Sequence, residues 1–183
     1  MKNDFAPQHL NVQAFAKAAA SLAGQPRLAH FTRLLEETHG MGADLPVVYT
    51  ARGEVRHEDQ PGEEIWLHLA AQVALPLTCQ RCLGPVDFPL AFDRSFRFVA
   101  TEELAAIEDE ESEEDVLVLS RDFNVLELIE DELLMAMPAV PKHEVCPVAV
   151  KLQVADPDFV EEGPAEKVNP FAVLEQLKKK PLA

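Results

Sequence analysis

The sequence is poor in cysteine, glycine and positive charge, and each shortage argues against a class of protein. Its 183 residues include three cysteines, an odd number and too few for a disulfide scaffold. Its seven glycines form no dinucleotide-binding loop, Walker loop or nucleophile elbow. With 16 basic residues against 32 acidic ones, the net charge is −16, so bulk nucleic acid and anionic membranes repel the chain. Any RNA contact therefore needs a local basic feature or a basic protein partner.

The sequence also lacks long hydrophobic runs. No run approaches the length of a transmembrane helix. Residues 1–24 lack the apolar core of a signal peptide, because Asp4 comes early and polar residues occur throughout. We therefore expect a cytoplasmic protein without a membrane partner.

What the chain does contain is a strong strand signal at its centre. Apolar residues dominate the odd positions of 65–77 and the even positions of 86–98, with mostly polar residues between them. Two such runs, joined by a short loop with Gly84 and Pro85, predict a long antiparallel hairpin.

Other elements are predicted on both sides of this hairpin. Apolar residues at helical spacing predict helices over 9–23, 25–40 and 124–137. Asn124 is placed to cap the third helix, and Pro138 ends it. Further strands are predicted within 44–64 and 116–120. The expected fold class is α+β, an antiparallel sheet built on the 65–98 hairpin with packed helices.

Two later segments have an unusual composition. Nine of the fourteen residues from Glu102 to Asp115 are acidic, which predicts a flexible loop because like charges repel. The alternative is an acidic imitation of a phosphate backbone. After residue 150 the chain turns polar, so we expect one α+β domain over 1–150 and a flexible tail over 151–183.

The tail ends in a short amphipathic segment. Three apolar residues at helical spacing precede three lysines: Phe171, Leu174, Leu177, Lys178, Lys179 and Lys180. A helix this short is stable only when it docks on another surface. This segment is therefore a candidate contact for RNA or for a protein partner.

Three cysteines and a histidine carry the candidate chemistry. Cys79 and Cys82 have the C-x-x-C spacing by which one tight turn supplies two thiolates to a tetrahedral zinc ion. His143 and Cys146 form a second pair at the same spacing, and the two pairs together would make a closed structural site. Arg81 would help to stabilise the thiolates.

Other interpretations of this motif stay open. Cys79 and Cys82 can also be small, semi-apolar residues at a hairpin tip, with His143 and Cys146 on an unrelated loop. We favour that interpretation, because a zinc ribbon would show a second C-x-x-C and more glycine. A thioredoxin-like redox pair is disfavoured, because such a motif opens a helix and this one closes a hairpin.

Candidate catalytic residues are sparse. The remaining histidines are scattered over predicted helix faces and strand edges, where we expect them at the surface: His9, His30, His39, His57 and His68. Carboxylates come in runs rather than singly in apolar surroundings, so they nominate no acid–base pair. We predict a non-enzymatic binding or assembly protein.

Three blocks of sequence together resemble a bacterial family. They are LTCQRCLGPV at 77–86, LELIEDELLMAMPAVPKH at 126–143 with Cys146 soon after, and NPFAVLEQLKK at 169–179. In this order they resemble the YceD family of large ribosomal RNA subunit accumulation proteins. Some relatives carry a C-P-x-C-G cluster after the helix. Here Ala149 stands where its second cysteine would be, so His143 would be the substitute ligand.

The resemblance implies a role in the synthesis, processing or stability of 23S rRNA, and so in large-subunit biogenesis, without enzymatic activity. We favour an indirect mechanism, in which an acidic surface holds a basic ribosomal protein or assembly factor. In a direct mechanism RNA would meet the basic residues Arg81, Arg94, Arg97 and Lys178 to Lys180. A zinc-clipped structural adaptor without direct RNA contact is the alternative function.

Overall fold

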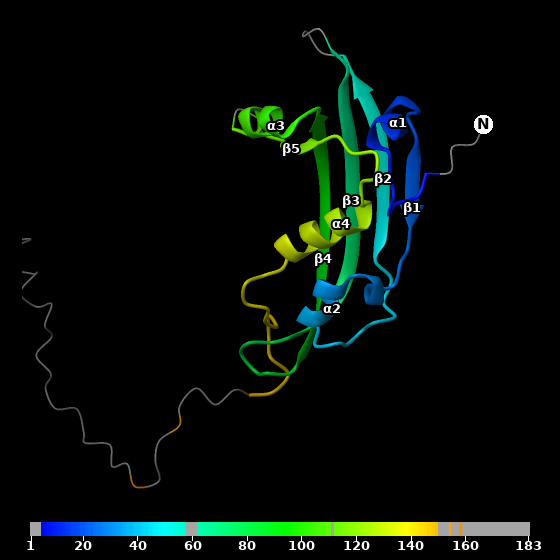
Figure 1. The fold of residues 1–183 in the computed structure, drawn as a ribbon. Helices are drawn as coiled ribbons and strands as arrows, with labels where there is room; N and C mark the ends of the chain where they lie inside the picture. Colours follow the sequence, from blue (N-terminus) through cyan, green and yellow to red (C-terminus); the bar gives the residue numbers. More distant parts are fainter. Residues whose placement is uncertain (1–4, 58–61, 111, 150–153, 155–157, 159–183) are drawn as a thin grey trace, which may run out of the picture. The chain divides into compact units, whose positions relative to one another are not determined.

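A five-stranded sheet forms the centre of the structure, a computed structural model that describes residues 5–57, 62–110, 112–149, 154 and 158 (Figure 1). Its strands are β1 (Ser21–Gly24), β2 (Val48–Arg56), β3 (Glu64–Thr78), β4 (Pro85–Val99) and β5 (Asp115–Val118), and they are neighbours in this order. Strands β1 to β4 run antiparallel, whereas β5 pairs in parallel with β4. The predicted α+β class is confirmed, with the correction that one strand pair is parallel.

Four helices accompany this sheet in the described residues: α1 (Val12–Lys17), α2 (Thr32–Glu37, after a 3-10 turn at Leu28–His30), α3 (Glu102–Asp109) and α4 (Val125–Met135). Residues of α1, α2 and α4 belong to the core on one face of the sheet. Helix α1 packs on β2 and β3, α4 packs on β3 and β4, and α2 packs against α4 (Figure 1). The core contains fully buried side chains such as Phe15, Phe31, Phe96 and Ile129. Within the described residues, no helix is long and apolar enough to cross a membrane.

The alternation of β3 decides which face of the sheet is buried. Its odd-numbered residues from Ile65 to Leu77 are all buried, and they belong to the same core as the apolar residues of α1 and α4. Its even-numbered residues point to the opposite face, which we call the open face. There Trp66 lies between Glu54 of β2 and Arg97 of β4. Helix α3 packs on β5 and reaches the open face through an ion pair between Glu108 and Arg97 (2.5 Å).

The predicted hairpin and the third predicted helix are confirmed. Strands β3 and β4 pair from Ile65 with Phe98 to Thr78 with Pro85. The side-chain oxygen of Asn124 caps α4 by accepting hydrogen bonds from the amides of Leu126 (3.1 Å) and Glu127 (3.4 Å). The local signals in these two segments were sufficient to define them.

The first two predicted helices differ from the observed ones. The helix predicted over 9–23 ends at Lys17, and the chain passes through Ala19 (φ 45°) into β1, which pairs with β2. The helix predicted over 25–40 is divided into the 3-10 turn and α2. Its first amides, those of Leu28 and Ala29, donate to the carbonyls of Leu45 and Ala43 in the following loop instead of continuing a helix.

The prediction of a flexible acidic loop after the hairpin is wrong over 102–109, where the chain forms α3. The hydroxyl of Thr101 caps this helix by accepting a hydrogen bond from the Leu104 amide (3.3 Å). Glu102 and Glu103 lie in the first turn, where the helix dipole favours negative charge. The cap, the dipole and the Glu108–Arg97 pair together offset the repulsion between like charges.

A buried carboxylate links α2 to α4. Glu130 of α4 is 7% exposed, and its Oε1 accepts hydrogen bonds from the amides of Arg33 (2.7 Å) and Leu34 (3.3 Å). Its Oε2 accepts from the Arg33 guanidinium (3.0 and 3.1 Å). Phe31 precedes α2 and offers no capping side chain, so Glu130 supplies the cap from a helix far away in the sequence.

Replacing Glu130 with alanine should lower the free energy of unfolding by about 3 kcal/mol, because two amides and a guanidinium lose a buried acceptor. Asp131→Ala is the matched control. Asp131 binds the same guanidinium, but its side chain is 52% exposed, so the loss should stay below about 1 kcal/mol. Urea unfolding followed by circular dichroism measures both values. Equal losses would show that Glu130 does not cap α2.

Candidate metal centre

The tip of the long hairpin brings Cys79 and Cys82 to the same side of a tight turn. The turn is closed by hydrogen bonds from the Cys79 amide to the Gly84 carbonyl and from the Leu83 amide to the Cys79 carbonyl, both 2.8 Å. Cys79 is buried and Cys82 is half-buried. The turn therefore holds two thiols close to each other at the end of a rigid strand pair.

The segment after α4 returns to this tip. The Gln80 amide donates to the Pro141 carbonyl (2.8 Å), and the Arg81 guanidinium donates to the carbonyls of His143 (2.7 Å) and Glu144 (3.2 Å). These contacts place the second pair of candidate ligands, His143 and Cys146, against the first.

The four candidate ligands meet at one point, so the favoured expectation that His143 and Cys146 lie on an unrelated loop is wrong. The ligand atoms of Cys79, Cys82, His143 and Cys146 all lie within 4.8 Å of one another. The sulfurs of Cys79 and Cys146 are 3.9 Å apart, and the Cys82 sulfur lies 3.4 Å from His143 Nδ1. A tetrahedral zinc ion with ordinary bond lengths would separate two sulfurs by about 3.8 Å and a sulfur from a nitrogen by about 3.6 Å. The cluster thus has the ligands and spacing of a site that can hold a metal ion such as zinc.

The surroundings prepare these groups for a cation. Burial alone would raise the pKa of the Cys79 thiol, but hydrogen bonds from the amides of Cys82, His143 and Arg81 lower this pKa to about 5. The Arg81 Nε donates to the Cys146 sulfur (3.1 Å), and this bond raises the pKa of the guanidinium. The sulfurs of Cys79 and Cys146 thus both accept hydrogen bonds from neighbouring N–H groups.

Cys82 and His143 are the other two candidate ligands, and they differ in how they would become able to bind a metal ion. The Gly84 amide lowers the pKa of the Cys82 thiol, but burial and the Cys79 and Cys146 sulfurs outweigh it, so this pKa is raised. Such a thiol would lose its proton on binding a metal. The Nε2 of His143 lies 3.0 Å from the Pro85 carbonyl oxygen, which assigns the proton to Nε2 and leaves Nδ1 free to bind the metal.

Comparison with known proteins agrees with the sequence motifs. Residues 67–178, which contain all four candidate ligands, match the family described as Large ribosomal RNA subunit accumulation protein YceD. The chain belongs to the YceD family. The large ribosomal RNA subunit accumulation protein YceD of Haemophilus influenzae is 37% identical over 114 residues, which cover 60% of this chain and 63% of that relative. The chain therefore spans less than two thirds of the curated relative. No solved structure is significantly similar to it.

In this YceD-family chain the arginines predicted to contact RNA have acceptors of their own. Arg81 faces the candidate metal centre, where it donates to the Cys146 sulfur and the His143 carbonyl. Arg94 binds Glu132 (2.9 Å) and Asp115, and Arg97 binds Glu108. The other predicted contacts, Phe171, Leu174, Leu177 and Lys178 to Lys180, lie outside the described residues. The division of the chain at residue 150 also stays a prediction.

A polar cluster on the open face was missed by sequence reasoning. The Nε2 of His68 lies 2.5 Å from Glu54 Oε2, and its Nδ1 lies 2.7 Å from Ser95 Oγ. Hydrogen bonds from His68 and Arg56 lower the pKa of the Glu54 carboxyl group. The His68 side chain is 19% exposed, so the prediction of a surface histidine is wrong here. The cluster joins β2, β3 and β4, and only the strand register brings its members together.

The backbone conformation of Leu83 allows the structure of the turn at the hairpin tip to be tested. Leu83 has a φ of 58°, a left-handed conformation that is unfavourable for an L-residue, and its side chain is 76% exposed. Leu83→Gly should therefore raise the free energy of unfolding by about 1 kcal/mol. Gln80→Gly at the same tip is the control and should lower it by about 0.5 kcal/mol, because the glycine loses more backbone entropy on folding. A loss of stability in Leu83→Gly, measured by urea unfolding, would contradict this account of the turn.

Proposed function

We propose that this protein is a non-enzymatic factor that supports the synthesis, processing or stability of 23S rRNA during large-subunit biogenesis in the cytoplasm. The observation that carries the proposal is the family match over residues 67–178. It is supported by a relative that bears the name large ribosomal RNA subunit accumulation protein and shares 37% identity with the chain.

The charges favour an indirect role, through a basic ribosomal protein or assembly factor. The net charge of −16 opposes a phosphate backbone. The guanidinium groups of Arg94 and Arg97 each face a carboxylate, and that of Arg81 faces a thiol and two carbonyls. Binding RNA through these side chains would require breaking the existing pairs. The three lysines at 178–180 are the remaining candidates for direct contact.

The candidate metal centre is part of this proposal as a structural zinc site. Three thiolates and one imidazole fill all four positions of tetrahedral zinc, whereas catalytic sites keep one position open. The ion would fasten the segment after α4 to the hairpin tip. A zinc-clipped adaptor that never touches RNA is the alternative function, and it is favoured by this same closed ligand set.

Removal of the gene should lower the ratio of 23S to 16S rRNA in growing cells, and a plasmid copy should restore it. Northern blotting and sequencing of the rRNA measure this ratio.

Replacing Lys178, Lys179 and Lys180 with glutamate should leave the ratio of 23S to 16S rRNA unchanged if the role is indirect. An unchanged ratio after gene removal would contradict the proposed function. Loss of RNA binding in the lysine variant, with its protein partners retained, would contradict the indirect mechanism.

The purified chain should contain about one zinc ion per molecule, measured by atomic emission after dialysis. Cys146→Ser and His143→Ala should each lose most of the metal, because each removes one of four ligands. His30→Ala removes an exposed histidine outside the cluster and should keep the metal. Chelation should lower the melting temperature of the native chain and leave that of Cys146→Ser unchanged. Full metal content in Cys146→Ser would exclude the cluster as the site.

A further inference from the structure

Helix α3 exposes its large apolar residues, unlike an ordinary surface helix. Such a helix normally buries its large apolar residues and exposes its charges. In α3 the two large apolar side chains are exposed, Leu104 at 43% and Ile107 at 61%, whereas Ala105 is buried. Two acidic side chains near its end make contacts within the domain: the half-buried Glu108 binds Arg97, and Asp109 accepts a hydrogen bond from the Val116 amide (3.3 Å). The outer face of α3 therefore presents apolar surface that the domain itself does not cover.

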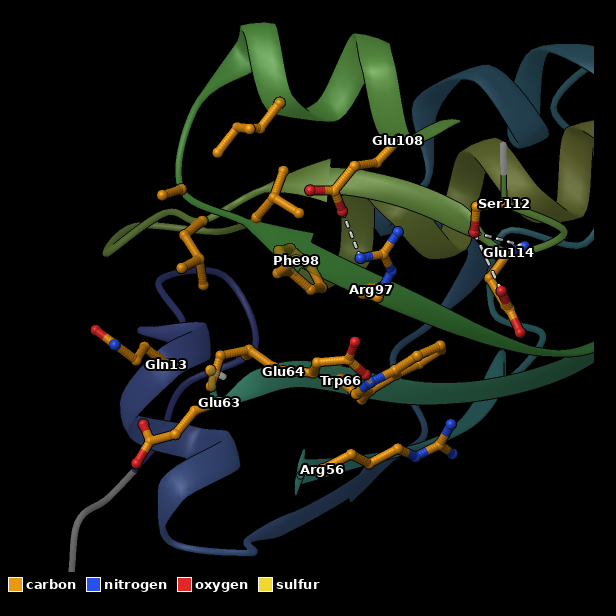
Figure 2. Close-up of a pocket in the computed structure, with 16 residues that line it drawn as sticks. Gln13, Arg56, Glu63, Glu64, Trp66, Arg97, Phe98, Glu108, Ser112 and Glu114 are labelled. Carbon is orange, nitrogen blue, oxygen red and sulfur yellow. Dashed lines mark hydrogen bonds and ion pairs between the residues drawn. The ribbon is translucent and has the colours of Figure 1, made fainter. Parts of the chain in front are cut away.

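A hollow lies beside this helix, at the ends of β3 and β4 away from the metal cluster (Figure 2). Its volume is about 820 Å³. Apolar side chains contribute to its walls, among them Ile65, Trp66, Phe98, Leu104 and Leu119. Four carboxylates also line it: Glu63, Glu64, Glu108 and Glu114. Leu104 belongs both to the exposed surface of α3 and to the lining of the hollow, so the two form one continuous surface.

The cations that line the hollow already have partners. Figure 2 shows Arg97 directed at Glu108, and the Arg56 guanidinium lies 4.2 Å from the centre of the Trp66 ring. Arg56 also binds Glu54 on the open face (3.3 Å). The sequence from Glu102 to Asp115 contains nine acidic residues, two of which (Glu108 and Glu114) line the hollow, and no lysine or arginine. The electrostatic potential around the hollow is therefore negative, and a cationic ligand would complement it.

We infer that the hollow and the outer face of α3 form a docking site for a lysine- and arginine-rich segment of a partner protein, anchored by apolar side chains. Apolar anchors would contact Leu104 and Ile107, and the flanking cations would meet the carboxylates of the acidic run. Phosphates would be repelled there, which makes RNA the less suitable occupant. The inference rests on the proposed function for the source of the partner, namely the basic proteins of the large subunit.

The fluorescence of Trp66 can be used to measure binding at this site. Trp66 is the sole tryptophan of the chain and lines the hollow, so its fluorescence reports on occupancy of this site. The full chain would be titrated with tiled 15-residue peptides that cover the large-subunit ribosomal proteins. At least one basic peptide with apolar residues should shift the Trp66 emission in a saturable way. Poly-lysine should bind more weakly, because it carries charge without apolar anchors.

Variants separate apolar anchoring from charge. Leu104→Ser combined with Ile107→Ser should weaken the peptide roughly ten-fold or more, because two apolar contacts are lost. Met41→Ser is the matched control. The exposed fraction of Met41 is 41%, similar to the 43% of Leu104, but Met41 lies in the loop after α2. Met41→Ser should leave binding of the peptide unchanged.

Glu110→Gln with Glu113→Gln should weaken binding of the peptide roughly three-fold at low salt and have no effect at high salt, where charges are screened. Ile107→Ser alone serves if the double variant of Leu104 and Ile107 fails to fold.

Three outcomes would overturn the inference. They are the absence of any peptide that shifts the Trp66 emission, equal weakening by Met41→Ser, and a saturable shift with transcribed 23S rRNA fragments that the Leu104 and Ile107 variants abolish. The first outcome leaves the proposed function standing if gene removal still lowers 23S rRNA. Peptide binding in a protein whose gene removal leaves 23S rRNA unchanged would instead refute the proposed function and keep the docking site.

Discussion

The register of β3 on β4 is the constraint on which the other features depend. Because side chains alternate along a strand, pairing Ile65 with Phe98 sends the odd residues of β3 into the core and the even residues to the open face. A slip of one residue would expose Leu67 and bury His68. The same register closes the hairpin between Cys79 and Gly84, so both thiols of the C-x-x-C motif come to its tip.

The hairpin also separates two surfaces of different chemistry. At the tip, three sulfurs and an imidazole form a cluster that could hold a metal ion, and such ligands suit a soft or borderline ion. At the other end, α3 and the strand ends enclose a hollow with apolar walls and an acidic surround. Strand β3 has 15 residues, of which the first three line the hollow, so about 40 Å of strand lies between the hollow and the tip. The candidate metal centre and the proposed docking site therefore lie at opposite ends of the hairpin.

Internal pairing of arginines explains why so acidic a chain folds and why its surface stays acidic. The buried carboxylates Glu130 and Glu132 are neutralised by Arg33 and Arg94, which removes the cost of burying an unpaired charge. Arg97 is occupied by Glu108 of α3. Since acidic residues are twice as numerous as basic ones, these pairs leave an excess of carboxylates facing solvent. Such a surface suits a basic protein better than a nucleic acid.

The sequence by itself determined the hairpin and α4 with its Asn124 cap, because alternation and capping are properties of neighbouring residues. The spacing of the two pairs made Cys79, Cys82, His143 and Cys146 candidate ligands, but the interpretation favoured on the sequence was that Cys79 and Cys82 are small residues of the hairpin turn. The sequence failed for α1 and α2, which are too short for local propensity to define. It also failed for α3, which is stabilised by Arg97 from a different element. Only the tertiary structure decided that His143 and Cys146 meet Cys79 and Cys82, that His68 joins Glu54 and Ser95, and which arginines are neutralised. Each of these outcomes depends on contacts between segments far apart in the chain, such as Gln80 with Pro141, and no local pattern encodes them.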